Sequence, residues 1–364
     1  MSYVILTGTR FDLGEFRRRA ERGEGPRHLV NQIADDLDAS VVQPGDAPVR
    51  WFDPILARLL GTTPELVAAA RSAARGGPDQ VVYCIGDDTG LALLLASLFA
   101  RRRCKPLIYV MAPQRTRMRI ALTAMRLVKR FPMLIVGTEA KRHYLVDRMR
   151  WPSTRLLQAI EQCDEAFFVP DPLLGSDRSG VHEPPWVASV GLEQRDYVTL
   201  AQATEGLDCA VRICAVSPNF TSRTTVALPD PEPAHFEMRH FDWPELRELY
   251  QQSAVLVVSL LDNVYSAGLT ALLEGIACGT PAILTRTPGL GSSLIDHDLV
   301  IGVPPGDAEA LRVAITEVLA DPHAAVGRAK RAREYFLLNH TSDQMFRTIS
   351  TAMRDLHAGP ALGE

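Results

Sequence analysis

The sequence predicts an α/β protein with two doubly wound, Rossmann-like domains that face a cleft. Short aliphatic and β-branched runs, such as 80–85 and 254–260, alternate with longer amphipathic stretches, which is typical of parallel sheets covered by helices. This pattern occurs on both sides of a stretch rich in proline and glycine at 170–185. The 364 residues are also enough for two separate cores.

The composition is that of a soluble globular protein. Hydrophobic residues make up 46% and charged residues 23% of the chain, and the net charge of −4 gives no general attraction to nucleic acid. The six cysteines form no C-x-x-C pair, so we expect reduced, buried thiols. The chain enters a strand without a basic leader, and no apolar run reaches about 18 residues. These features favour a cytoplasmic location.

The charge is unevenly distributed. Residues 101–150 contain fourteen lysines and arginines but only two acidic residues, Glu139 and Asp147, which gives this segment a charge of +12 and the remainder −16. Such asymmetry indicates an anionic partner or surface. The alternative is a solvated basic helix over 115–129 that packs its apolar stripe on its own sheet.

We expect the first domain to span 1–170. Thr63 and Pro64 resemble a helix start, with threonine as the cap and proline at the first helical position. The expected strands are 3–6, 38–42, 80–85, 106–111, 133–136 and 156–160, and the expected helical segments are parts of 11–37, then 52–75, 91–101, 115–129 and the start of 138–150.

Small and polar residues follow three of these strands. Gly8 follows the first strand without a G-x-G-x-x-G motif, Asp87 and Asp88 follow a later buried strand, and Gln114 follows the next one. Because ligands bind at the carboxyl ends of open parallel sheets, we expect these residues to lie on a functional rim. The alternative is that one aspartate only caps the following helix.

We expect a linker over 171–185 and a second domain over 186–342. The expected strands of the second domain are 186–190, 209–216, 234–241, 254–260, 281–285 and 299–303, and the expected helices lie within 197–203, 242–250, 270–278, 309–319 and 325–337, with a last helix over 340–356.

The segment 253–285 reads as strand, loop, helix and strand. A small-residue loop before a helix amino terminus favours an anion, since unpaired backbone N–H groups and the helix dipole face it. Glu274, about one turn into the helix, could accept hydrogen bonds from a diol such as ribose. Alternatively, the glycine only relieves a tight turn and Glu274 caps or pairs locally. The loop and helix start consist of Ser266, Ala267, Gly268 and Thr270.

This segment, SAGLTALLEGIACGTPAILT, resembles the donor-binding segment of the group-4 family of retaining glycosyltransferases, which have the GT-B fold. Members of that family typically carry two glutamates eight positions apart, followed by an Ala-x-Ala-x-Gly-x-Pro run. Glu274 matches the second glutamate, whereas Ser266, which carries no charge, replaces the first. The run is matched by Ala277, Gly279 and Pro281, with Gly275 in place of its first alanine.

Further similarities lie around 190–200. The family places a glycine after the first strand of this domain, matched by Gly191, and basic residues in the next loop neutralise the donor diphosphate. Leu192 stands where a basic residue is usual, so the resemblance gives this role to Arg195, whose guanidinium can bind phosphate bidentately. The alternative is an ion pair of Arg195 with Asp196 or Glu193.

Other parts of the resemblance are less specific. The family holds the nucleobase with backbone groups in a turn that falls here on Arg239 to Phe241. The segment 163–170 is similar to the family's Val-Asp-x-x-x-Phe-x-Pro signature. In the GT-B fold the last helix, here 343–364, returns to the first domain.

The resemblance implies a nucleotide-sugar-dependent transferase, with a UDP-sugar as donor, that retains the configuration of the anomeric carbon. Arg195, the amides of 266–268 and the Thr270 hydroxyl would stabilise the leaving diphosphate. Glu274 and Asp87 are further candidate catalytic residues. The nine histidines lack metal-ligand spacing, so we expect a metal-independent reaction without a cofactor. Donor contacts are assigned to Gly191, Arg195, Arg239, Phe241, Ser266, Ala267, Gly268, Thr270 and Glu274, and the acceptor side to Gly8, Asp87, Asp88 and Gln114.

The acceptor remains open between a small molecule, such as a carbohydrate or specialised metabolite, and a lipid-linked molecule. The basic segment 101–150 would allow peripheral contact with the anionic inner face of a membrane, and no nucleic acid partner is expected. Because Ser266 removes a charged residue, a catalytically silent nucleotide-sugar-binding protein is the first alternative. An epimerase or phosphorylase of the same architecture is the second, but no acid–base pair or lysine motif for pyridoxal stands out.

Overall fold

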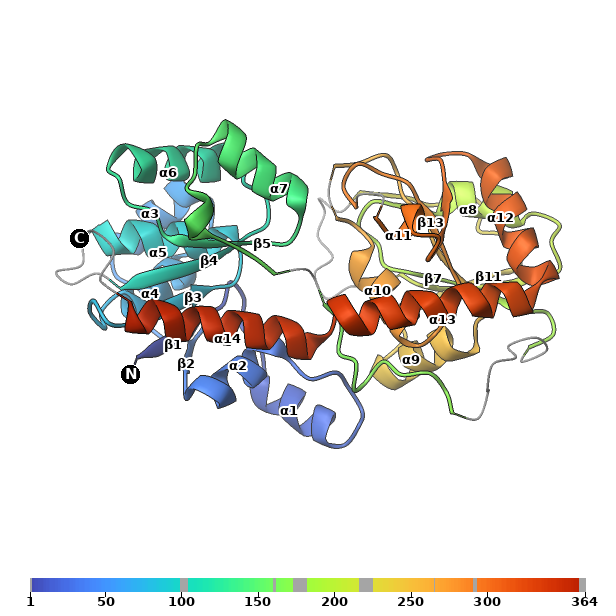
Figure 1. Cartoon of the computed structure of the whole chain (residues 1–364), viewed down its shortest axis with the longest axis horizontal. Coiled ribbons are helices and arrows are strands. Elements are labelled where there is room, and N and C mark those ends of the chain that lie inside the picture. The colour runs from blue at the N-terminus through green and yellow to red at the C-terminus, as the bar shows by residue number, and fades with distance from the viewer. Residues whose placement is uncertain are drawn as a thin grey trace. The chain divides into compact units, whose positions relative to one another are not determined.

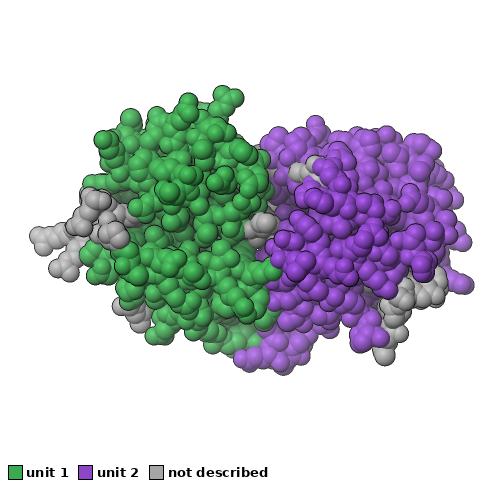
Figure 2. Space-filling view, viewed as in Figure 1, with its two compact units in different colours: residues 1–18, 27–160, 343–364 green, residues 19–26, 161–342 purple. Residues whose placement is uncertain are grey.

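The chain forms two compact units (Figure 1). The computed structural model describes residues 2–98, 104–159, 162–172, 182–215, 225–264, 266–290 and 293–359. Unit 1 comprises 1–18, 27–160 and 343–364, and unit 2 comprises 19–26 and 161–342, as Figure 2 shows. Each unit contains a six-stranded sheet whose paired strands are parallel, which confirms the predicted α/β fold class.

The sheet of unit 1 has the strand order β2-β1-β3-β4-β5-β6. The order reverses between β1 and β3, so their carboxyl ends form the switch point of this sheet. Strand β3 is buried throughout, as its apolar sequence predicts. The strands are β1 (Tyr3–Leu6), β2 (Ser40–Val42), β3 (Val81–Cys84), β4 (Lys105–Val110), β5 (Met133–Val136) and β6 (Leu156–Gln158).

Helices cover both faces of this sheet. On one face α2 and α14 pack against Ile5 and Leu107, with Ile349 of α14 in the same apolar cluster. On the other face α4, α5 and α6 pack against Val82 and Ile108. The helices are α1 (Leu13–Glu21), α2 (Leu29–Leu37), α3 (Asp53–Leu60), α4 (Pro64–Ala73), α5 (Asp87–Leu98), α6 (Thr116–Leu127), α7 (Glu139–His143) and α14 (Ser342–Ala358), with short helical turns at Tyr144–Arg148 and Ser153–Arg155.

The sheet of unit 2 has the order β11-β9-β7-β12-β13-β14. When only the six strands of this sheet are numbered along the chain, the order is the 3-2-1-4-5-6 of the Rossmann fold. Its switch point lies between the first and fourth strands, here β7 and β12. The strands are β7 (Trp186–Val190), β9 (Ala210–Cys214), β11 (Phe236–Arg239), β12 (Val255–Val258), β13 (Ala282–Thr285) and β14 (Ile301–Val303), and a separate parallel pair is formed by β8 (Arg195–Asp196) and β10 (Val226–Ala227).

Helices also cover both faces of the second sheet. On one face α9, α10 and α13 share an apolar cluster that contains Leu256, Leu272 and Phe336. On the other face α8 and α12 pack against Val257 and Ile283. The helices are α8 (Tyr197–Thr204), α9 (Trp243–Gln252), α10 (Leu269–Ala277), α11 (Ser293–Asp296), α12 (Ala308–Ala320) and α13 (Pro322–Asn339).

Two boundaries differ from the sequence-based expectations. The helical segment 52–75 is two helices, because Gly61 ends α3 in the left-handed region at φ 69°. Thr63 caps α4 as predicted, since its hydroxyl accepts a hydrogen bond from the Leu66 amide.

Residues 161–170 belong to unit 2 rather than to the first domain, because Phe167 and Phe168 pack in the core beside α9. Residues 173–181 of the expected linker lie outside the described residues.

The six cysteines are free and buried, which confirms that expectation. Burial raises the pKa of the Cys84 and Cys163 thiols well above the ordinary value, so these sulfurs stay protonated and unreactive. Within the described residues, no helix is both long and apolar enough to span a bilayer.

Lys105 binds the carboxyl end of α14 to the sheet of unit 1. Its buried Nζ donates hydrogen bonds to the carbonyl oxygens of His357 (3.2 Å) and Gly359 (2.6 Å), where the helix leaves carbonyls without intrahelical partners. Replacing Lys105 with methionine should lower the free energy of unfolding by about 2 kcal/mol, because two charge-assisted hydrogen bonds are lost. Urea unfolding measures the change against Lys330→Met, at an exposed position of α13. Equal midpoints for both variants would contradict this role.

Candidate functional site

The switch point of unit 2 carries glycines on both sides. Gly191 directly follows β7 and has a φ of 106°, and Gly268 precedes α10 with a φ of 87°. Both values lie in the left-handed region, which glycine adopts readily and residues with a Cβ rarely adopt. The chain therefore turns sharply at the carboxyl ends of the two strands where a doubly wound sheet binds ligands.

The side chain of Arg195 lies between these two turns. Its Nε and Nη2 donate to the Val190 carbonyl oxygen at 2.9 and 2.6 Å, and Nη1 donates to the Glu193 carbonyl oxygen at 3.0 Å. A Cβ on Gly191 would collide with Nη2, and a Cβ on Gly268 would lie 3.3 Å from Nη1. The turns are thus close enough to hold the guanidinium between them.

The guanidinium of Arg195 is buried without a carboxylate partner in the part of the chain that the structure describes. Only 4% of the residue is exposed, and among the described residues its hydrogen bonds go to neutral backbone carbonyls. Burial lowers the pKa of this guanidinium, but arginine stays charged at neutral pH. A buried charge is costly unless it is paired, so this site favours an anion.

Neither of the two ion pairs considered for Arg195 forms. The Asp196 carboxylate instead accepts from the backbone N–H and hydroxyl of Thr199, at 2.9 and 2.6 Å, and caps α8. Glu193 contributes its carbonyl oxygen rather than its carboxylate. Neither carboxylate forms an ion pair with the Arg195 guanidinium, and the Glu193 charge acts on it only by raising its pKa against the effect of burial.

Ser259 holds β8, which contains Arg195, against the end of β12, a role that was not predicted from the sequence. Its hydroxyl donates to the Asp196 carbonyl oxygen at 2.8 Å, and the Asp196 amide donates back to the Ser259 carbonyl oxygen at 3.1 Å. The available signal was a polar residue directly after the apolar run that forms β12. Serine there can pair with a neighbouring backbone without widening the sheet.

The predicted loop and helix start also lie at this switch point. Among the described residues no side chain caps α10, so the amides of its first turn lack intrahelical partners. The Ser266 hydroxyl donates to the Gly289 carbonyl oxygen at 3.3 Å. Ala267 and Gly268 form the turn, and Thr270 is exposed. A nine-residue helix with an open amino terminus thus begins beside Arg195.

Glu274 is more deeply buried in unit 2 than expected for a residue that binds the ribose of a ligand. It is 7% exposed, and its Oε2 accepts a hydrogen bond from the Tyr250 hydroxyl at 2.8 Å. Burial raises the pKa of Glu274 to about 7, and the Tyr250 hydrogen bond opposes that rise. The local pairing considered as the alternative for this residue is therefore present.

The buried Glu274 predicts a dependence of stability on pH. Because its folded pKa of about 7 exceeds the ordinary value of 4.5, its protonated form favours folding below pH 4.5, and this advantage is lost as the pH rises through 7. Between these pH values the wild type should lose up to about 3 kcal/mol relative to Glu274→Gln, whose amide does not titrate. Urea unfolding at several pH values tests this, and parallel pH curves for both proteins would contradict it.

Arg239 and Phe241 lie at the carboxyl edge of the same sheet, after β11. Strand β9 separates β11 from β7, so this turn is about 10 Å from Gly191. The Arg239 guanidinium stacks 3.7 Å from the Phe241 ring centroid and also pairs with Glu237 and Glu245. The structure brings Gly191, Arg195 and Gly268 into contact, and Arg239 and Phe241 lie along the same edge.

In unit 1, the predicted acceptor-side residues follow strands β1, β3 and β4. Gly8 is exposed, and a Cβ there would lie 3.6 Å from Thr89 Cγ2. Asp88 and Gln114 are exposed. The Asp87 carboxylate is buried and accepts from the amides of Met111 (2.9 Å) and Ala112 (3.0 Å).

The two backbone hydrogen bonds give Asp87 a structural role that the sequence did not indicate. They bind the start of α5 to the end of β4, rather than capping α5. Burial raises the pKa of Asp87, and the two hydrogen bonds oppose the rise. With an oxygen engaged by each amide, a base role for Asp87 stays a prediction.

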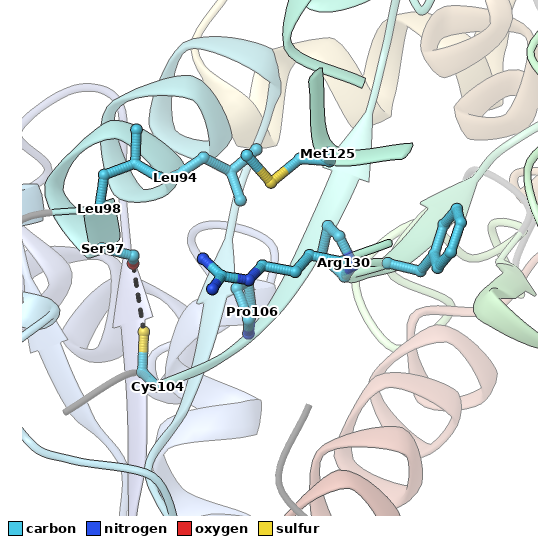
Figure 3. A pocket seen from close by; sticks show the side chains of 9 residues that line it. Leu94, Ser97, Leu98, Cys104, Pro106, Met125 and Arg130 are labelled. Atoms are coloured by element: carbon cyan, nitrogen blue, oxygen red, sulfur yellow. Dashed lines mark hydrogen bonds between the residues drawn. The ribbon is translucent and has the colours of Figure 1, made fainter. Parts of the chain in front are cut away.

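Neither a small cavity of unit 1 nor a metal cluster offers a further site. The cavity in Figure 3 has a volume of about 60 Å³ and is lined by Leu94, Cys104, Met125 and Arg130, which is far below the size of sites for small molecules. Ser97 and Cys104 approach to 3.8 Å there. Among the described residues, no group of three or more histidine, cysteine and acidic side chains is placed to hold a metal ion.

Comparison with known proteins identifies the segment that carries much of this site. The family model described as "Glycosyl transferases group 1" matches residues 233–335. The similarity to this family lies in the second of the two units. Glycogen synthase from Mycobacterium tuberculosis is 34% identical to this chain over 125 residues, which are 34% of the chain and 28% of that protein. The chain thus matches less than a third of the length of this curated relative.

The likeness to solved structures extends over nearly the whole chain. Sucrose-phosphate synthase from Thermosynechococcus elongatus superposes with a TM-score of 0.69 at 18% identity, covering 98% of this chain and all 100% of that one. HepE from Anabaena, in complex with UDP and glucose, superposes with a TM-score of 0.65 at 13% identity, covering 97% and 99%. These likenesses confirm the predicted GT-B fold with its two Rossmann-like domains.

Proposed function

We propose that this protein is a glycosyltransferase, which transfers a sugar from a nucleotide-sugar donor, most simply a UDP-sugar, to a small-molecule or lipid-linked acceptor. The observation that carries the proposal is the buried guanidinium of Arg195. It lacks a carboxylate partner among the described residues and lies beside Gly268 and the open amino terminus of α10. A diphosphate would supply negative charge to both positive features, the guanidinium and the helix amino terminus.

The proposed reaction retains the configuration of the anomeric carbon. The bond between that carbon and the diphosphate oxygen breaks, the acceptor hydroxyl attacks from the same face, and its proton passes to the departing phosphate. Negative charge grows on the diphosphate as the bond breaks, so Arg195 and the first amides of α10 stabilise the transition state more than the bound donor. These fixed positive groups are proposed to replace a divalent metal ion.

Serine at position 266 supports one alternative. Its hydroxyl is directed to the Gly289 carbonyl oxygen, and it brings no charge to a donor sugar. A protein that binds a nucleotide sugar without transferring it is therefore the second candidate function.

Nucleotide binding and turnover separate these two functions. A thermal-shift panel of UDP, GDP, ADP and TDP should show stabilisation by one diphosphate, with UDP expected, because a ligand that binds only the folded state raises its stability. Release of that nucleotide diphosphate from the corresponding nucleotide-diphosphate glucose, only when extracts containing acceptors are added, would support transfer. Binding without acceptor-dependent release would support the silent alternative, and no shift with any nucleotide would reject both.

Peripheral contact of unit 1 with an anionic membrane is part of the proposal. Helix α6 presents the exposed residues Arg115, Arg117 and Arg119 together with exposed Ile120 and Leu127, a combination that suits an anionic interface. Met118 and Leu122 of the same helix are buried against the sheet. Pull-down with phosphatidylglycerol vesicles should weaken as salt rises, and binding that ignores salt or headgroup charge would contradict the proposal.

A further inference from the structure

A cavity of about 500 Å³ lies on the helical face of unit 1, between α3, α4 and α5. Its apolar lining includes Phe52, Leu56, Val67 and Leu95. The volume falls in the range of sites that enclose a small organic molecule, and such sites are mostly apolar with a few polar groups. The cavity is thus large enough and apolar enough for a ligand.

Its charged groups are unbalanced in favour of cations. Arg50, Arg71 and Arg75 line it together with a single acid, Asp53. The Asp53 carboxylate is buried and already binds Arg71 at 2.9 Å and the Arg50 amide at 2.7 Å. Among the described residues, Arg50 and Arg75 have no carboxylate within ion-pair distance, although Arg50 is near enough to Asp53 to help lower the pKa of that carboxyl. Their charges are available to an anionic group at the edge of the cavity.

Exposed apolar side chains adjoin the same cavity. Trp51, which lines it, is 83% exposed, and Ile55 and Leu59 on α3 are 63% and 69% exposed. Apolar surface gains stability when it leaves water, and an indole ring offers a large area for such contact. An apolar chain seated at Trp51 would cover this surface.

The cavity is separate from the rim proposed for the acceptor. Helix α5 starts at Asp87, at the carboxyl end of β3, and lines the cavity with Ala92, Leu95 and Ala96. The rise of the helix places these residues about 8 to 13 Å along the axis from Asp87. Arg75 lies just past the end of α4 and before β3, toward the opposite edge of the sheet.

We propose that this cavity binds a single-chain amphiphilic anion. The aliphatic chain lies against Phe52, Leu56 and Leu95, and the phosphate or carboxylate head binds Arg50 and Arg75. The ligand is either a soluble single-chain phosphate or a lipid drawn from a membrane, since both present the same head and chain. This site goes beyond the sugar transfer proposed above and does not depend on it.

Titration of the whole chain with dodecyl phosphate below its micellar concentration tests the proposal. Tryptophan fluorescence should change saturably, and the change should be lost in Trp51→Phe while calorimetry still detects binding. The double variant Arg50→Gln/Arg75→Gln should bind at least about 10-fold more weakly, because charged contacts to the head are removed. Arg58→Gln, at an exposed arginine of α3 that does not line the cavity, is the matched control. Ala96→Trp should fill the cavity and weaken binding similarly.

Several outcomes would overturn the proposal. They are equal affinity for dodecyl phosphate and neutral dodecyl maltoside, equal affinity of the double variant and Arg58→Gln, or no binding to wild type. Vesicles of phosphatidylglycerol distinguish the two sources: loss of vesicle binding in the double variant indicates a membrane lipid, and unchanged vesicle binding indicates a soluble ligand. The UDP thermal shift of each variant reports the fold and the donor site separately, so failure here and failure of the proposed function remain distinguishable.

Discussion

Replacing Arg195 with alanine is expected to lower kcat about 100- to 1,000-fold, the usual effect of removing one preorganised charge-stabilising donor. The guanidinium is held by the carbonyls of Val190 and Glu193 before any ligand arrives, so it need not reorganise as charge develops on the diphosphate. KM for the acceptor should change little, because Arg195 belongs to the donor side. Steady-state kinetics with the donor identified by the nucleotide panel measure both constants.

The variants Arg195→Lys and Arg331→Ala complete this experiment. Lysine keeps the charge but not the planar, bidentate geometry, so its kcat should fall between those of wild type and alanine. Arg331 is exposed on α13 and pairs with Asp298, so its loss should leave kcat unchanged. Equal losses of kcat and acceptor binding in Arg195→Ala would argue against a role in leaving-group stabilisation. The melting temperature of each variant shows whether the fold is retained.

Replacing Gly268 with alanine is expected to lower the free energy of unfolding by about 2–5 kcal/mol. Its φ of 87° costs a residue with a Cβ about 1–2 kcal/mol. The added Cβ would also lie 2.6 Å from Val258 Cγ1, and such overpacking costs about 1–3 kcal/mol more. Urea unfolding measures the loss, and UDP should bind more weakly because the Cβ also crowds Arg195 Nη1.

Gly206→Ala separates the two contributions. Gly206 has a similar positive φ of 70°, but an added Cβ would meet nothing within 4 Å, so only the backbone cost applies. The difference between the two variants therefore measures the close approach of Val258 and Arg195 to Gly268. Equal destabilisation of both variants, with unchanged UDP affinity in each, would mean that this close approach has no energetic consequence.

The local features of the site could be predicted from the sequence. The small residues at 266–268 predicted a turn before a helix, and the structure has Gly268 at a positive φ and α10 starting at Leu269. The glycine after β7, Gly191, was implied by the resemblance to the glycosyltransferase family, which places a glycine after this strand. These features depend on neighbouring residues, which turn and helix propensities describe well.

Contacts between distant segments were beyond such reasoning. The sequence did not indicate that Arg195 would bond to backbone carbonyls and form no ion pair with Asp196 or Glu193, because that depends on how β8 lies beside the end of β12. Glu274 was expected to face a ligand, yet α9 and α13 cover α10 so fully that every residue from Ala271 to Ala277 is buried. Periodicity along one helix does not reveal which other helices cover it.

Domain limits were uncertain for a similar reason. Phe167 and Phe168 lie in the segment 163–170, and its similarity to the family's signature at the end of the first domain implied that they complete that domain. Their rings pack instead near Trp243 and Tyr250 of α9. The partner of an aromatic pair is decided by tertiary packing, which composition alone does not specify.

The carbonyls that hold Arg195 have a consequence for redesign. Every amino acid supplies the same carbonyl oxygen, so exchanging the side chains of Val190 or Glu193 leaves the acceptors of the guanidinium chemically unchanged. Residues proposed to touch a sugar or a nucleobase can therefore be varied in a library without changing the groups that hold the guanidinium proposed to bind the phosphates. Altered donor preference should be obtainable from this scaffold at little loss of rate.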